Sequence, residues 1–210
     1  RERTDSMKQN HMITLVLSIL IAVVYIMMTI ISLAQYPAAF SPLSNWLSDL
    51  GNRIVSPMGS IYYNSGIYIT GILLVLFFLS LNGNRLPGNK TQNIMLFLTQ
   101  VIGVLGSLAM IMSGIFSIDN PEPHSLFSMF LRIGLGSAFG FSVAAFFYYK
   151  KFSKFILMVG LITTLTDLVV SLLYHDTPAL EWPVIFLFLL YCVLLGNEVH
   201  RLDKMKLISL

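Results

Sequence analysis

The sequence predicts an all-α integral membrane protein, with residues 1–210 forming a single domain of six transmembrane helices. Only 11% of the residues are charged and 56% are hydrophobic, whereas an average soluble domain has about 25% charged and about 45–50% apolar residues. Because so few charged residues cannot cover the surface of a protein in water, most of the surface must face lipid. Six long apolar stretches and a one-sided distribution of basic residues support this interpretation. A soluble enzyme and a nucleic-acid-binding protein are excluded, although the net charge is +3.

A helix needs roughly 20 apolar residues to cross a bilayer, and each predicted span approaches or exceeds this length. A helix is expected because it satisfies the hydrogen bonds of its own backbone within lipid. The spans, in order, are 12–34, 61–81, 93–117, 125–149, 155–174 and 183–196. The first is longer than the roughly 7–15-residue core of a signal peptide, so we expect an uncleaved helix. Polar, turn-forming segments separate the last five spans, at 82–88, 119–123, 150–154 and 175–178.

The basic residues predict the orientation. All but two of the 13 Lys and Arg residues lie in the tails or in the second and fourth connections, and the exceptions are Arg53 and Arg132. Because cytoplasmic loops are enriched in Lys and Arg, we expect both termini to be cytoplasmic. The protein is then a multi-pass protein of the cell membrane.

Two charges fall within the predicted spans, where each costs at least about 2.5–3.5 kcal/mol. Arg132 lies in the fourth span and Asp167 in the fifth, and counting along the helices places them within about 6 Å in depth. They could form a structural ion pair that joins the two helices. They could also form a charged wall of a polar cavity that opens outward.

The first external connection, about 35–66, contains a predicted short interfacial helix. Ser41 caps it, a proline follows and Gly51 ends it. The helix could lie at the level of the lipid headgroups as an amphipathic segment. Alternatively, it could tuck into the mouth of the bundle. Three side chains would then point inward: Ser48, Asp49 and Arg53.

Other polar residues lie near this boundary. Asn64 is an unusual amide at the start of the second span, whereas Tyr63 is explained as an interfacial aromatic residue. Asp119 and His124 lie in a short connection restricted by two prolines, and a histidine with a carboxylate can bind a metal or act as acid and base. The adjacent pair at 175–176 is more typical of an ordinary polar loop. No standard metal-binding or cofactor-binding motif is present, so any metal and any cofactor remain unidentified.

Glycines in the third and fourth spans provide small surfaces where helices can approach closely. Gly136 and Gly140 form a GxxxG pattern. Two uses of this pattern remain open, packing within the bundle and dimerisation.

Several short motifs resemble one known family. They are Leu47–Gly51, Asn64–Gly66, Gly114–Asp119 and the nearby His124. Together they resemble domain of unknown function 998 (DUF998), a family of six-helix prokaryotic membrane proteins that looks distantly similar to the Frag1/DRAM/Sfk1 proteins. The chain departs from the family pattern at Ser117, where proline is usual, and at Asp49, where glutamate is common. The resemblance covers nearly the whole chain and implies no activity.

The resemblance emphasises five of the polar residues on the outer side, Ser48, Asp49, Asn64, Asp119 and His124. Our first hypothesis is an outward-facing site that binds a lipid headgroup or a small polar ligand, and that could hydrolyse or remodel a lipid. Asp119 and His124 would then be catalytic. The ligand would be bound by Ser48, Asp49, Arg53, Asn64, Arg132 and Asp167.

The second hypothesis is a non-enzymatic scaffold, sensor or accessory subunit of a larger membrane complex. Its partner would be a second copy of the chain or another membrane protein. The absence of a complete catalytic motif favours it, and neither hypothesis involves a nucleic acid. Whether the protein is an enzyme therefore remains open at this point.

Overall fold

The computed structural model describes residues 2–173 and 177–208 and is built from helices. The elements are α1 (Glu2–Ala34), η1 (Leu47–Gly51), α2 (Pro57–Ser80), η2 (Leu81–Asn84), α3 (Lys90–Ile115), α4 (Pro121–Phe147), α5 (Lys154–Leu173) and α6 (Pro178–Ile208). The η elements are 3₁₀-helices, and all six α-helices contain a stretch long and apolar enough to cross a membrane. The prediction of a polytopic, all-helical membrane protein is confirmed.

The ends of the helices differ from the predicted spans, mainly at prolines. α2, α4 and α6 begin at Pro57, Pro121 and Pro178, four or five residues before the predicted starts. Proline is well suited to the first turn of a helix because the first backbone N–H groups need no partner within the helix. From the sequence alone, these three prolines are expected in the separating loops, so the predicted starts are late. Residue 174, the predicted end of the fifth span, lies outside the described residues.

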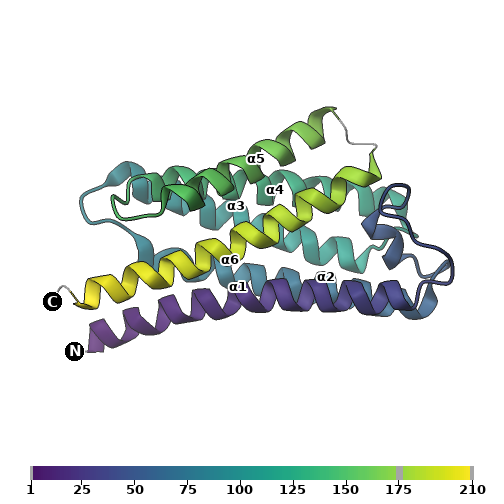
Figure 1. Cartoon of the computed structure of the whole chain (residues 1–210), viewed down its shortest axis with the longest axis horizontal. Helices are drawn as coiled ribbons and strands as arrows, with labels where there is room; N and C mark the ends of the chain where they lie inside the picture. Colours follow the sequence, from purple (N-terminus) through teal and green to yellow (C-terminus); the bar gives the residue numbers. More distant parts are fainter. Residues whose placement is uncertain (1, 174–176, 209–210) are drawn as a thin grey trace.

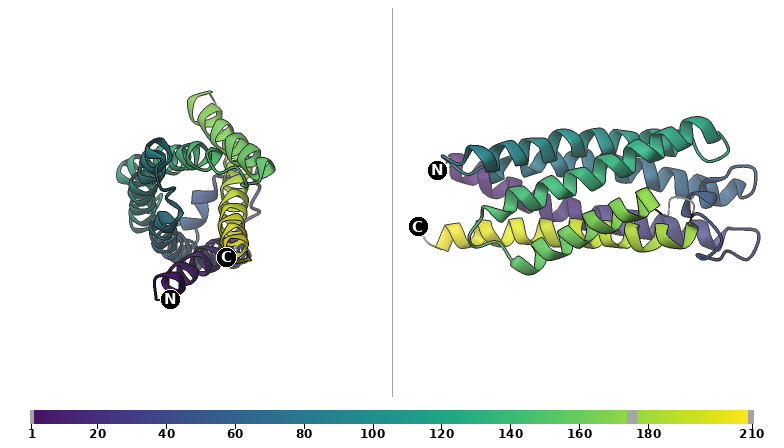
Figure 2. Two further views of the ribbon diagram at one scale, coloured as in Figure 1. Left: turned by 90° about the vertical axis from the view of Figure 1, so that its left-hand side faces the viewer. Right: turned by 90° about the horizontal axis from the view of Figure 1, so that it is seen from above.

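The six helices form a ring in which each helix packs against the next and α6 packs against α1 (Figures 1 and 2). Both chain ends lie at one end of the bundle, which we call the terminal end. The opposite end, which we call the distal end, carries the long connection between α1 and α2 and the turn between α3 and α4. α5 packs mainly against α4 and α6.

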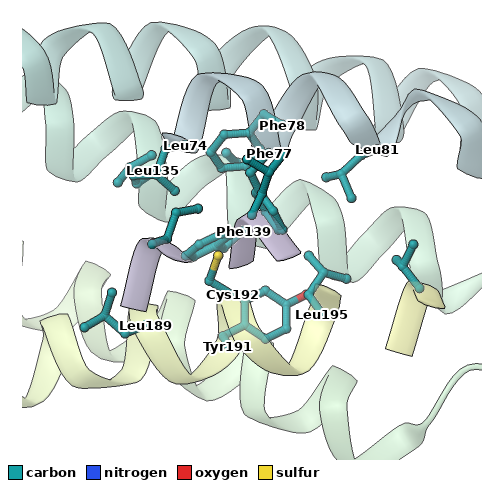
Figure 3. Close-up of a cluster of buried hydrophobic side chains, with 14 of the residues drawn as sticks. Leu74, Phe77, Phe78, Leu81, Leu135, Phe139, Leu189, Tyr191, Cys192 and Leu195 are labelled. Carbon is teal, nitrogen blue, oxygen red and sulfur yellow. The ribbon is translucent and has the colours of Figure 1, made fainter. Parts of the chain in front are cut away.

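Aromatic side chains fill the middle of the ring (Figure 3). Phe77 and Phe78 of α2 and Phe139 of α4 are each 1% exposed or less. The ring of Phe139 lies 5.1 Å from that of Tyr191 in an edge-to-face arrangement, and the Tyr191 hydroxyl pairs with Ser142 Oγ at 2.8 Å. Such aromatic pairs add about 0.5–1.5 kcal/mol to the stabilisation from burial. The packed aromatic residues separate the two ends of the bundle.

Polar contacts fasten the terminal end. Glu198 forms an ion pair with Arg201 and accepts a hydrogen bond from the backbone N–H of Ser153 at 2.7 Å, which ties α6 to the connection between α4 and α5. The hydroxyl of Tyr149 donates to the carbonyl of Asn84. Burial raises the pKa of Tyr149 to about 12.

The small residues of α4 serve packing within the bundle. A Cβ on Gly134 would lie 2.7 Å from the Cα of Gly106, so α3 and α4 cross with their backbones in contact. Gly136 and Gly140 face Asp167 and Thr164 of α5. Of the two uses left open for this GxxxG pattern, the structure therefore supports packing between α4 and α5.

Candidate functional site

The first distal connection turns back into the mouth of the ring. Leu47, Leu50 and Gly51 of η1 are buried, and η1 contacts α1, α2 and α6. η1 is therefore tucked against the helices, as one of the two alternatives predicted, and does not lie on the surface of the bundle. The predicted helix is also shorter than expected, because residues 41–45 form a turn and only 47–51 are helical.

Asp49 and Asn64 hold η1 in place. The Asp49 carboxylate accepts the backbone N–H of Trp46 at 2.9 Å and so caps η1. The side-chain amide of Asn64 donates to the carbonyl of Gly51 at 2.9 Å. A Cβ on Gly51 would lie 2.4 Å from Asn64 Oδ1, so only glycine fits there without a shift of that amide. Ser48 lies between these contacts and is partly buried.

Arg53 lies on the surface of the distal end, so the prediction that it points into the bundle is wrong. η1 has already ended at Gly51, and the guanidinium donates to the carbonyl of Ile115 at 3.0 Å. This contact joins the first distal connection to the end of α3. Arg53 and Asn64 also line a shallow surface groove of about 370 Å³ beside the start of α2.

Asp119 and His124 are each bonded within their own connection. The Asp119 carboxylate accepts the hydroxyl of Ser117, and His124 Nδ1 lies 2.9 Å from the carbonyl oxygen of Phe116. Within the described ranges, no group of three or more His, Cys, Asp or Glu residues could hold a metal. The catalytic role of Asp119 and His124 stays a prediction. The pair at 175–176 lies outside the described residues.

The environment of Asp119 gives a testable pH dependence. Burial by itself would raise its pKa, but the Ser117 hydroxyl, its own backbone and the charge of Arg53 outweigh burial and hold the pKa below 3.8. This carboxylate therefore stabilises the fold above its unfolded pKa, and the contribution is lost as pH falls through the lower folded value.

The variant Ser117→Ala should raise the pKa of Asp119 towards its ordinary value, measured by carbon-13 NMR titration of the carboxyl group. Ser44→Ala, at an exposed serine of the other connection, is the control. An unchanged pKa in Ser117→Ala would show that this hydrogen bond does not set it.

Arg132 of α4 lies within electrostatic range of two carboxylates, Asp167 of α5 and Glu181 of α6, and we call these three side chains the charge cluster. The charge of Arg132 interacts with both carboxylates. In the part of the chain that the structure describes, Arg132 makes no direct ion pair with either of them. The proposed structural ion pair is thus replaced by a longer-range attraction among three helices.

Asp167 has the most unusual surroundings in the charge cluster. It is 5% exposed, and its Oδ2 packs so closely against Gly136 that a Cβ there would lie 2.1 Å away. Its Oδ1 is buried with no hydrogen-bond partner in the structure. A buried carboxylate oxygen without a donor is costly.

Glu181 connects the charge cluster to η1. Its Oε2 accepts the backbone N–H of Leu47 at 2.6 Å. Its charge also acts on Tyr25 of α1 and Tyr63 of α2, two tyrosines buried in the bundle. Tyr63 is 6% exposed, so its side chain is buried in the bundle rather than exposed at the lipid-facing surface. Charged and hydroxyl groups of five helices and the backbone of η1 converge here.

Glu181, Tyr25 and Tyr63 are not among the site residues predicted from the sequence. A signal for Glu181 was available, because Pro178 followed by an acidic residue is typical of the first turn of a helix. That pattern places Glu181 within α6 rather than in a loop. No local signal distinguishes the two tyrosines, because their contact joins positions far apart in the chain.

The motifs that carry the family resemblance lie together at the distal end, as bonded partners around η1 and in the turn between α3 and α4. Among curated proteins and solved structures, none matches the chain. The model of one family, "Protein of unknown function (DUF998)", matches residues 19–196, which is most of the six-helix bundle. The chain therefore belongs to the DUF998 family.

Proposed function

We propose that the protein binds the polar headgroup of a membrane lipid in the distal half of the ring, at the charge cluster. The observation that carries the proposal is the buried Oδ1 of Asp167, which has no donor although Arg132 acts on the same carboxylate. A bound polar group would satisfy that oxygen. Arg132 and Glu181 are partly exposed, so the cluster is not sealed.

The position of the cluster favours a lipid over a ligand from solution. Asp167 lies six residues before the end of α5, which corresponds to about 9 Å of helix. Leu168, Leu172 and Leu173, on other faces of this turn, are exposed by about half or more and suit contact with acyl chains. A headgroup at this depth would keep its chains beside α5.

Binding without chemistry has more support than hydrolysis. Asp119 and His124 are occupied by contacts at the turn between α3 and α4. A scaffold role has less support, because the small residues of α4 face α3 and α5. Those residues are therefore not a free surface for a partner helix.

Lipids retained by the purified protein test the proposal. We expect wild type in a mild detergent to retain one headgroup class at near-stoichiometric levels, measured by mass spectrometry of extracted lipid. Asp167→Asn and Arg132→Gln should each lose most of it, because each removes a charge that faces the headgroup. Glu122→Gln is the matched control, since Glu122 is an exposed carboxylate at the same end. Equal retention by all four proteins would contradict the proposal, and a co-purifying membrane protein together with equal retention would favour the scaffold.

A further inference from the structure

An open groove lies beside the connection between α2 and α3, at the terminal end of the bundle (Figure 1). Its volume is about 420 Å³, and it shares no lining residue with the charge cluster or with the smaller groove at Arg53. We call it the terminal groove. Its lining residues are Arg85, Gly88, Lys90, Asn93, Ile94 and Phe97.

Hydrogen bonds fix the backbone of the connection that borders the terminal groove. The side chain of Asn93 accepts the backbone N–H of Leu86 and donates to the carbonyl of the same residue, both at 3.1 Å. The buried amide of Gln92 accepts that N–H as well, at 3.0 Å. Gly88 has a φ of 78°, a conformation that glycine adopts readily and that turns the chain towards α3. The backbone that carries the two basic residues of the groove is therefore held in one conformation.

The two basic residues of the terminal groove have no acidic neighbour along the chain. Arg85 and Lys90 are exposed, and no Asp or Glu occurs between Asp49 and Asp119. Within the described residues, neither Arg85 nor Lys90 forms an ion pair. Arg85 Nε donates to Asn82 Oδ1 at 2.9 Å, which orients the guanidinium and leaves both terminal nitrogens free to donate. Guanidinium and ammonium groups suit a phosphate ligand.

Along α3 the lining of the groove changes from charged to apolar. Lys90, Ile94 and Phe97 follow one another at steps of four and three residues, so they lie on one face of the helix. Phe97 lies about 10 Å along the axis from Lys90 and is 52% exposed. The same face continues with exposed apolar side chains, those of Val101, Leu105 and Leu108. A phospholipid has the same order of chemistry, from the phosphate through the glycerol to the acyl chains.

We propose that the terminal groove binds an anionic phospholipid, at a site independent of the charge cluster. The headgroup phosphate lies between Arg85 and Lys90, as anionic headgroups do in basic pockets at the ends of membrane helices. An acyl chain lies against Phe97 and the exposed face of α3 beyond it. A free phosphate would contact the cations and leave the apolar part of the groove uncovered, so a lipid fits the whole groove. The inference goes beyond the proposed function, because it concerns the other end of the bundle and residues of opposite charge.

Titration of the full chain in a mild nonionic detergent tests the inference, with binding followed by native mass spectrometry. Phosphatidylglycerol should bind at least about fivefold more tightly than phosphatidylcholine with identical acyl chains, because each Lys or Arg near the headgroup attracts an anionic lipid. The double variant Arg85→Gln/Lys90→Gln should lose this preference and still bind phosphatidylcholine. Lys150→Gln/Lys151→Gln is the matched control and should keep the preference. It removes the same amount of charge at exposed residues outside the groove.

Three results would overturn the inference. The first is equal binding of the two lipids by wild type. The second is an equal loss of preference in both double variants, which would assign the preference to net charge. The third is competition by soluble glycerophosphoglycerol, the headgroup without acyl chains, at the affinity of the lipid. That competition would assign the groove to a soluble phosphate ester.

Asp167→Asn distinguishes this site from the charge cluster. The variant should keep the preference for phosphatidylglycerol, because Asp167 does not line the terminal groove. A preference that is lost in Asp167→Asn but survives Arg85→Gln/Lys90→Gln would overturn this site and support the proposed function. A preference that survives Asp167→Asn and is lost in Arg85→Gln/Lys90→Gln would support the terminal groove, whether or not lipid binding at the charge cluster is confirmed.

Discussion

Replacing Arg132 with methionine should lower the free energy of unfolding by about 2–3 kcal/mol, somewhat less than the loss of one partner from a fully buried ion pair. Methionine fills similar apolar volume but leaves the carboxylates of Asp167 and Glu181 without a compensating cation. Unfolding by sodium dodecyl sulfate in mixed micelles, followed by circular dichroism, measures the change. Arg53→Met is the matched control and should cost less than about 1 kcal/mol, because Arg53 is exposed.

A second substitution identifies the origin of the loss. Adding Asp167→Asn to Arg132→Met should recover at least about half of it, because the more deeply buried of the two negative charges is then removed. Residues that do not interact give additive losses. If the double variant is less stable than Arg132→Met, the attraction between Arg132 and Asp167 does not stabilise the bundle.

The charge cluster shows which parts of the candidate site can be predicted from the sequence alone. Arg132 and Asp167 could be paired in advance because each lies within a span and helical rise fixes its depth. Glu181 belongs to the same cluster but was placed outside a span that was predicted to begin at residue 183. The error at Pro178 was therefore an error in the site as well as in the fold. The two tyrosines lie on neighbouring helices, α1 and α2, and the faces by which these helices pack are not encoded in hydropathy.

In the distal connections, the sequence identifies the polar residues but not the roles of their side chains. Composition identified Asp49, Asn64, Asp119 and His124 as unusual polar residues at the membrane boundary, and the structure places all four at the distal end. The sequence could not show that the hydrogen bonds of these residues fix the conformation of the connections. Asn64 bonds to the carbonyl of Gly51, and His124 bonds to that of Phe116. Because every residue has a backbone carbonyl, the residue types do not reveal these acceptors. Polar residues with satisfied partners are thus hard to distinguish from a site until partners are known.

The crossing of α3 and α4 leads to the second large effect, from Gly134→Ala. A Cβ at Gly134 would lie 2.7 Å from the Cα of Gly106, and a backbone atom cannot rotate away as a side chain can. The two helices must separate, which should cost about 2 kcal/mol of unfolding free energy by overpacking even after the gain in helix propensity. The same detergent unfolding experiment measures it.

Two further variants test whether the cause is this one contact. Gly140→Ala, on the same helix, meets only a methyl group of Thr164 at 3.1 Å, and should be within about 1 kcal/mol of wild type. Gly106→Ala meets the backbone of Leu135 and Gly134 from the other side, at 2.9 and 3.0 Å. Combined with Gly134→Ala it should cost clearly less than the sum of the single losses, because helices that have already moved apart accommodate the second methyl group. Additive losses would mean that each glycine is needed for a reason of its own, and that the backbones of α3 and α4 do not meet here.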